Sequence, residues 1–235
     1  MRYSIVRNYG FLLKNIVSIN TQLIRGVWSI SRLPEPRATV FGGTHVSANS
    51  YYARQAHVLS HKLAQAGISV ITGGGPGIMY AASCGVTDEE KSNHVSAKTL
   101  GITVAGLEQT KEILENQCLD QVIVVDHFLT RKWLMMNFSI AFAVFPGGFG
   151  TLDELAEVAM MMQLRRMPGI PLILISKAYW QPLMDWFSQS VYAAGLIKAT
   201  DMQIFRITDD IDEAFFWIAE RCELCNLTVH GNNLK

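Results

Sequence analysis

The sequence predicts an α/β fold in which one parallel sheet is covered by helices on both faces. Short apolar runs alternate with helical stretches along most of the chain. The runs are largely continuous rather than alternating, which is typical of strands buried on both faces. A strand followed by a helix, repeated, favours parallel strands joined by right-handed crossovers. A doubly wound, Rossmann-like sheet is therefore expected.

Seven apolar runs are predicted as strands, at residues 38–42, 68–72, 101–105, 121–125, 139–145, 171–175 and 203–207. Helices are expected at residues 50–66, 78–85, 130–137, 152–166, 179–194 and 209–225. Pro34 and Pro36 separate this region from the residues before it, because proline interrupts helices. We expect a helical arm at 1–36, one domain at 37–226 and a tail at 227–235.

The N-terminal arm has apolar residues at helical spacing, among them Leu12, Ile16, Ile19 and Leu23. It carries five basic residues, and no acidic residue precedes Glu35. A targeting or membrane-surface segment has this composition, and so has an amphipathic helix that packs on a domain. We favour a helical extension that docks on the domain or on a neighbouring subunit.

The composition excludes several classes of protein. Hydrophobic residues make up 49% of the chain, which is incompatible with intrinsic disorder. Lys plus Arg and Asp plus Glu number 20 each, so no excess of positive charge favours binding to nucleic acid. No apolar stretch approaches the ~18 residues that would cross a bilayer.

The cysteines stand at 84, 118, 222 and 225, which is too few for a disulfide framework in a chain of this size. Cys222 and Cys225 form a C-x-x-C pair, but no second pair or histidine cluster completes a zinc site. Reduced thiols and a cytoplasmic protein are therefore expected, with no metal and no cofactor.

Two glycine-rich loops each follow a predicted strand and precede a predicted helix, at residues 73–77 and 146–151. Glycines there let a ligand approach the backbone, and the N-terminus of the next helix attracts anions. Neither loop has the lysine of a P-loop or the spacing of a dinucleotide-binding fingerprint. The pair of loops predicts a site for a phosphate or a nucleotide.

Charged residues flank the second loop. Thr151 and Glu154 have the spacing of a helix capping box, but the same position would aim the Glu154 carboxylate at a ligand in the loop. Both interpretations stay open. Arg131 and Lys132 open the preceding helix, where cations oppose the helix dipole unless they face a bound anion. Asp153 and Glu157 are expected on the solvated helix surface.

These residues resemble a known family. Residues 146–154, PGGFGTLDE, match the P-G-G-x-G-T-x-x-E signature of the LONELY GUY family of nucleoside 5′-monophosphate phosphoribohydrolases, which have also been called lysine decarboxylases. Arg131-Lys132 matches the family's R-K pair, residues 73–79 match its first glycine loop, and Glu108-Gln109 resembles the E-Q of longer members. The resemblance extends from about residue 38 to about residue 219.

The resemblance implies hydrolysis of the N-glycosidic bond of a purine nucleoside 5′-monophosphate to free base and ribose 5-phosphate. Family substrates include AMP and the N6-prenylated adenosine monophosphates that are cytokinin precursors. Arg131 and Glu154 would be the catalytic pair. Family members are commonly homodimers, so a homodimer or larger homo-oligomer is expected. The substrate and its phosphate would be held by Gly147, Gly148, Gly150, Thr151, Lys132, Gly74, Gly75, Glu108, Gly43 and Thr44.

This sequence departs from the family pattern after its first strand. Longer members often have G-S-A-R, where this chain has Gly42-Gly43-Thr44-His45, and His45 is either a ligand contact or a solvated turn residue. The alternative function is a nucleotide or phosphorylated-cofactor carrier or sensor without turnover, similar to the molybdenum-cofactor carriers. Decarboxylation is disfavoured, because lysine decarboxylation normally uses a pyridoxal cofactor bound to a lysine, and the sequence indicates no site for one.

Overall fold

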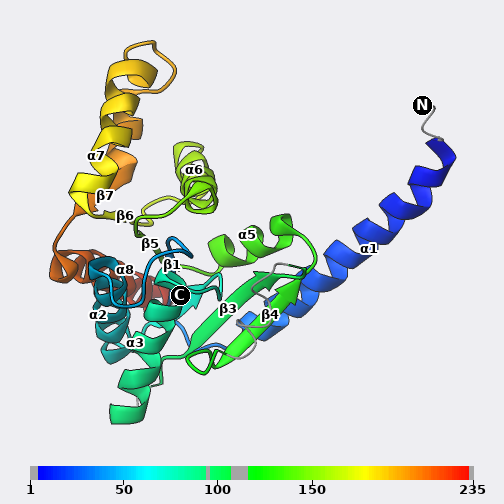
Figure 1. The fold of residues 1–235 in the computed structure, drawn as a ribbon, viewed down its shortest axis with the longest axis horizontal. Coiled ribbons are helices and arrows are strands. Elements are labelled where there is room, and N and C mark those ends of the chain that lie inside the picture. Colours follow the sequence, from blue (N-terminus) through cyan, green and yellow to red (C-terminus); the bar gives the residue numbers. More distant parts are fainter. Residues whose placement is uncertain (1–4, 94–95, 107–115, 233–235) are drawn as a thin grey trace.

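A computed structural model of the protein describes residues 5–93, 96–106 and 116–232 (Figure 1). Within them, seven strands form one parallel sheet of order β4-β3-β2-β1-β5-β6-β7. The predicted fold class is confirmed. The strands are β1 (Arg37–Phe41), β2 (Ser69–Thr72), β3 (Thr99–Val104), β4 (Gln121–Val125), β5 (Ala141–Val144), β6 (Leu172–Ile175) and β7 (Phe205–Thr208).

Helices connect the strands and cover both faces of the sheet. They are α1 (Ile5–Ile30), α2 (Tyr51–Gln65), α3 (Ile78–Asn93), α5 (Phe128–Asn137), α6 (Phe149–Gln163), α7 (Lys177–Trp186) and α8 (Ile211–Asn232). A π-helical segment, Phe187–Tyr192, continues α7, and a 3-10 helix, Ala199–Ile204, precedes β7. Helix α8 continues past residue 225, where the sequence pattern predicts its end.

Two apolar cores lie on the two faces of the sheet. One core packs Ala56 and Leu59 of α2, Ile78 of α3 and Ala214 of α8 against the strands. The other packs Leu134 of α5, Leu155 of α6 and Trp180 of α7, together with Ile30 of α1. The residues of β1, β2, β3, β5 and β6 are buried, which explains their continuous apolar runs, while those of the edge strands β4 and β7 are mostly only partly buried.

The strand order reverses between β1 and β5. From β1 the chain builds outward through β2, β3 and β4, and then returns to the other side of β1 with β5. The loops after β1 and β5 therefore lead to helices on opposite faces of the sheet. Between these loops, a crevice is left at the carboxyl ends of the two strands. In open α/β sheets, ligands bind in this crevice.

Helix α1 docks on the domain by its C-terminal half. Ile30 and the following Leu33 are buried in the core, and Gly26 lies so close to Leu134 of α5 that a Cβ atom would clash. Gln22 bonds with both the backbone and the side chain of Asp126, the residue after β4. Toward its N-terminus the helix runs out beyond β4, away from the domain (Figure 1).

The structure corrects the expectation that the cysteines are unpaired. Cys84 of α3 and Cys118 form a disulfide, with their Cα atoms 4.7 Å apart. The two residues are 34 positions apart in the sequence. The turn before β4 is held against α3, because the Thr87 hydroxyl donates a hydrogen bond to the Cys118 carbonyl.

Within the described residues, no helix is long and apolar enough to span a membrane. In the same residues, no group of three or more His, Cys, Asp or Glu side chains has the geometry to hold a metal ion.

Candidate active site

A cavity of about 580 Å³ opens at the crevice between β1 and β5. Its volume is typical of small-molecule sites. The loop after β1, the loop after β5 and the first turns of α6 form most of its wall. It is lined by Gly42, Gly43, Thr44, His45, Val46, Tyr52, Met79, Arg131, Pro146, Gly147, Gly148, Phe149, Gly150, Thr151, Glu154 and Tyr179.

The loop after β5 presents the N-terminus of α6 to this cavity. Gly148 is the N-cap, so the N–H groups of the next residues have no partner within the helix. A Cβ atom on Gly147 would collide with the Thr151 side chain and lie 2.8 Å from the Gly43 nitrogen, so this position requires glycine. A Cβ atom on Gly148 or Gly150 would meet nothing within 4 Å. The arrangement is suited to an anion held by backbone N–H groups.

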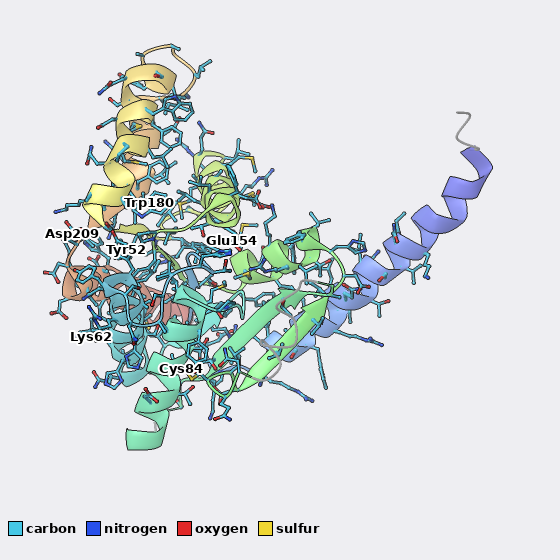
Figure 2. The ribbon with its side chains drawn as sticks, in the orientation of Figure 1. Tyr52, Lys62, Cys84, Glu154, Trp180 and Asp209 are labelled. Atoms are coloured by element: carbon cyan, nitrogen blue, oxygen red, sulfur yellow. A yellow bond between two sulfur atoms is a disulfide. The ribbon has the colours of Figure 1, made fainter. Side chains whose placement is uncertain are left out.

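The capping-box interpretation of Thr151 and Glu154 is wrong. Helix α6 begins at Phe149, so Thr151 is its third residue and Glu154 its sixth. Glu154 is therefore too far along the helix to bond back to the N-cap. Its side chain lies between α6 and α5 instead (Figure 2).

Glu154 pairs with Arg131 of α5. The Arg131 Nη2 atom lies 3.3 Å from Glu154 Oε1, and the two side chains are only 13% and 11% exposed. The Arg131 Nε donates a hydrogen bond to the carbonyl of Ile102, within β3, at 2.9 Å. A Cβ atom on Gly73 would collide with the guanidinium, so the first glycine loop makes room for Arg131. Contacts with α6, β3 and the first glycine loop therefore hold the Arg131 guanidinium beside the Glu154 carboxylate at the cavity wall.

Burial raises the pKa of Glu154 from its ordinary value of 4.5 to about 7, and the Arg131 guanidinium limits the rise. The carboxyl group is removed from water, which disfavours its ionised form. A carboxyl group with a pKa near 7 can both accept and release a proton at neutral pH. This property suits a general acid or base.

This raised pKa predicts a pH-dependent cost to stability. Between pH 4.5 and 7 the folded protein holds a proton on Glu154 that the unfolded chain has released, so stability falls as the pH rises. In a Glu154→Gln variant this position stays neutral. We expect the variant to gain about 3 kcal/mol relative to wild type between pH 4.5 and pH 8. Urea unfolding of both proteins at the two pH values measures this gain. If the difference in unfolding free energy between the variant and wild type were the same at pH 4.5 and pH 8, the prediction would be wrong.

Lys132, the neighbour of Arg131, forms ion pairs with two other carboxylates of α6 and not with Glu154. Its Nζ atom lies 3.0 Å from an Asp153 carboxylate oxygen and 2.6 Å from a Glu157 carboxylate oxygen. The hydrogen bond with Glu157 is the main reason why the pKa of Lys132 is raised. Glu157 is thus a half-buried partner of α5 and not the solvated residue expected, while Asp153 is exposed but paired. Lys132 does not line the cavity, and its role toward phosphate stays a prediction.

The remaining predicted residues fall into three groups. Gly43 and Thr44 line the cavity, together with His45, whose Nδ1 atom is 3.0 Å from the Thr44 hydroxyl. Gly74 and Gly75 lie in the first loop but do not line the cavity, so their role also stays a prediction. Glu108 lies outside the described residues.

Sequence reasoning missed Tyr179 and Tyr52. Tyr179, near the start of α7, donates a hydrogen bond from its hydroxyl to the Gly147 carbonyl at 2.5 Å. Tyr52, on α2, lines the same cavity (Figure 2). Tyr179 follows the carboxyl end of β6, which was a usable signal, because ligand sites gather at that edge of the sheet.

The sequence and the fold of this chain are similar to those of known proteins. A family model described as "Possible lysine decarboxylase" matches residues 79–217. The cytokinin riboside 5′-monophosphate phosphoribohydrolase LOG5 of Arabidopsis thaliana is 32% identical over 170 residues, which are 72% of this chain and 71% of that protein. The chain belongs to the LONELY GUY family.

A second member of the LONELY GUY family, from rice (Oryza sativa subsp. japonica), bears the name "Probable cytokinin riboside 5′-monophosphate phosphoribohydrolase LOGL1". It is 30% identical over 169 residues, 72% of each chain. Among solved structures, the molybdenum cofactor binding protein of Rippkaea orientalis matches with a TM-score of 0.57 at 22% identity, over 79% of this chain and 96% of that one. The molybdenum cofactor carrier protein of Chlamydomonas reinhardtii matches with a TM-score of 0.54 at 18% identity, over 79% and 97%. These structural matches show a shared fold.

Proposed function

We propose that this protein hydrolyses the N-glycosidic bond of purine nucleoside 5′-monophosphates, AMP or its N6-modified forms, to free base and ribose 5-phosphate. The observation that carries the proposal is the buried Arg131–Glu154 pair in the cavity wall, beside the N-terminus of α6. A carrier needs the anion site, but it does not need a carboxyl group with a pKa near 7 next to it. The names of the relatives agree with this reaction class.

In this proposal the phosphate binds at the N–H groups of Gly148, Gly150 and Thr151, which places the ribose toward Glu154. Cleavage builds positive charge on the sugar, and the Glu154 carboxylate stabilises it and takes a proton from the attacking water. The water oxygen bonds to C1′ while the bond from C1′ to the base nitrogen breaks. The base takes up a proton as it leaves, and Arg131 stabilises negative charge that develops on the base or the phosphate.

Chromatography of the bases released from a panel of nucleoside monophosphates tests the proposal. The panel holds AMP, GMP, CMP, UMP and N6-isopentenyladenosine monophosphate, with adenosine as the substrate that lacks phosphate. We expect base release from the purine nucleotides and little from adenosine, because the phosphate positions the sugar. Release of phosphate instead of base would overturn the proposal. Binding without any release would support the carrier alternative.

Tyr179 is proposed to position the second glycine loop, because its hydroxyl group bonds to the Gly147 carbonyl. A Tyr179→Phe variant loses this bond, whose contribution is about 1 kcal/mol. We expect KM for AMP to rise about fivefold while kcat changes less than twofold. Tyr192→Phe, at a partly exposed tyrosine outside the cavity, is the matched control. A fall in kcat with unchanged KM would contradict the positioning role.

We also propose that the protein assembles as a homodimer or larger homo-oligomer. Phe149 stands at the rim of the cavity with 92% of its surface exposed, and Met160 and Leu164 of the same helix region are also exposed. A second copy would remove these apolar side chains from water. Light scattering is expected to give at least twice the chain mass of 26.2 kDa. A monomer mass at micromolar concentration would contradict the proposal.

A further inference from the structure

One face of helix α1 is apolar and is not covered by the domain. The docked face carries Leu23, Val27 and Ile30, which pack against the core. The neighbouring face, about 100° around the helix, carries Leu13, Val17, Ile24 and Trp28, which are 63%, 64%, 71% and 59% exposed. Their spacings of four, seven and four residues align them as one stripe along the helix, called here the outer stripe.

A row of basic side chains runs along one edge of the outer stripe. Lys14 and Arg25 are exposed and eleven residues apart, close to three helical turns, and the exposed Arg32 follows two residues after the end of α1. The Arg32 guanidinium lies 3.4 Å from the centre of the Trp28 ring, so this row and the stripe touch. The sequence has no Asp or Glu among its first 34 residues. The outer face of α1 is therefore both apolar and purely cationic.

A second copy of α1 is a poor partner for this face. In an antiparallel pair related by a twofold axis, the same edges of the two helices meet, so the basic row would face itself. In a parallel pair the row would face the other edge, where α1 offers no acidic residue. Either pairing buries the outer stripe while it leaves the cations without an opposite charge.

We propose that the outer stripe of α1 docks on the surface of an anionic lipid bilayer, with the helix axis parallel to the membrane. Apolar side chains enter the boundary between headgroups and acyl chains, and the basic row contacts anionic headgroups. Trp28 suits this boundary, because its ring is apolar and its N–H group is polar. The docked C-terminal half of α1 would hold the domain on the membrane, since Ile30 and Leu33 are buried in the core.

Sedimentation of the full-length protein with vesicles tests this proposal. Vesicles of phosphatidylcholine with about 30% phosphatidylserine are compared with vesicles of phosphatidylcholine alone. We expect binding to the anionic vesicles, weak binding to the neutral ones, and loss of most binding in about 0.5 M salt. A Lys14→Gln/Arg25→Gln variant is expected to bind about 30-fold more weakly, because each cation near an anionic surface contributes roughly a factor of five.

A second variant tests the apolar part of the same face. Val17→Ser/Ile24→Ser removes exposed side chains, so the fold is preserved, and we expect at least tenfold weaker binding to anionic vesicles. Leu196→Ser/Phe216→Ser, at exposed apolar residues away from α1, is the control and is expected to bind like wild type. Equal binding of wild type to neutral and anionic vesicles, or none to either, would overturn the proposal. Binding that survives both α1 variants would overturn it as well.

Discussion

A Glu154→Gln variant is expected to release base from AMP about 10³-fold more slowly than wild type. Glutamine has the shape of the protonated carboxyl group and fills the same place beside Arg131, but it can neither accept a proton nor carry negative charge. In the proposed reaction it loses the group that activates water and stabilises the charge on the sugar. The measurement is kcat for adenine release at pH 8, where Glu154, with a pKa of about 7, is mostly ionised.

Glu157→Gln is the matched control for this variant. Glu157 lies three residues further along α6 and pairs with Lys132, so its loss disturbs the same contact between helices without touching the cavity. We expect Glu157→Gln to keep kcat within threefold of wild type. If both variants lost activity equally, a general disturbance of α6 would explain the effect, and if neither did, Glu154 would not be catalytic.

The Glu154 carboxyl group should also make both activity and stability depend on pH. Wild type should gain activity as the pH rises through about 7, since the ionised form of Glu154 is the active one. Over this range its stability should fall, because the buried charge is unfavourable. In wild type, activity and stability thus change in opposite directions with pH because both depend on the ionisation of Glu154. Glu154→Gln should show neither trend.

The fold was predictable because its strands are buried on both faces. The predicted runs at 38–42 and 171–175, for example, correspond to β1 (Arg37–Phe41) and β6 (Leu172–Ile175), because parallel strands covered on both sides need nearly continuous apolar residues. The position of the glycine loops at strand ends predicted the cavity edge for the same reason. Only the strand order, which the sequence pattern does not encode, brings the loop after β1 beside the second glycine loop, after β5, to form one site.

Other features could not be predicted, because they depend on distances between remote segments or on one helix boundary. A T-x-x-E spacing fits a capping box, but it fits equally well inside a helix that begins three residues earlier, and α6 begins there, at Phe149, with Gly148 as its N-cap. The partnership of Lys132 with Glu157 needs the packing of α5 on α6. The Cys84–Cys118 disulfide needs the turn before β4 to lie on α3. None of these has a local pattern in the sequence.

Replacing Arg131 by alanine is expected to lower kcat/KM for AMP by 10² to 10³-fold, the loss typical of a removed electrostatic stabiliser of the transition state. The variant should also raise the pKa of Glu154 above about 7, because the guanidinium now counteracts the effect of burial. The rise of activity with pH should therefore shift to higher pH. A pH profile of kcat/KM for wild type and Arg131→Ala measures both effects.

Arg131→Lys separates charge from geometry. Lysine keeps the positive charge near Glu154, but its single ammonium group cannot also reproduce the planar bond from Arg131 Nε to the Ile102 carbonyl. We expect its pH profile to resemble that of wild type while kcat/KM stays at least tenfold lower. If Arg131→Ala left the pH profile unmoved, the Arg131–Glu154 pair would not control the protonation of the carboxyl group. If Arg131→Lys were fully active, the guanidinium would act only through its charge. The space that Gly73 leaves for the guanidinium would then not be needed for activity.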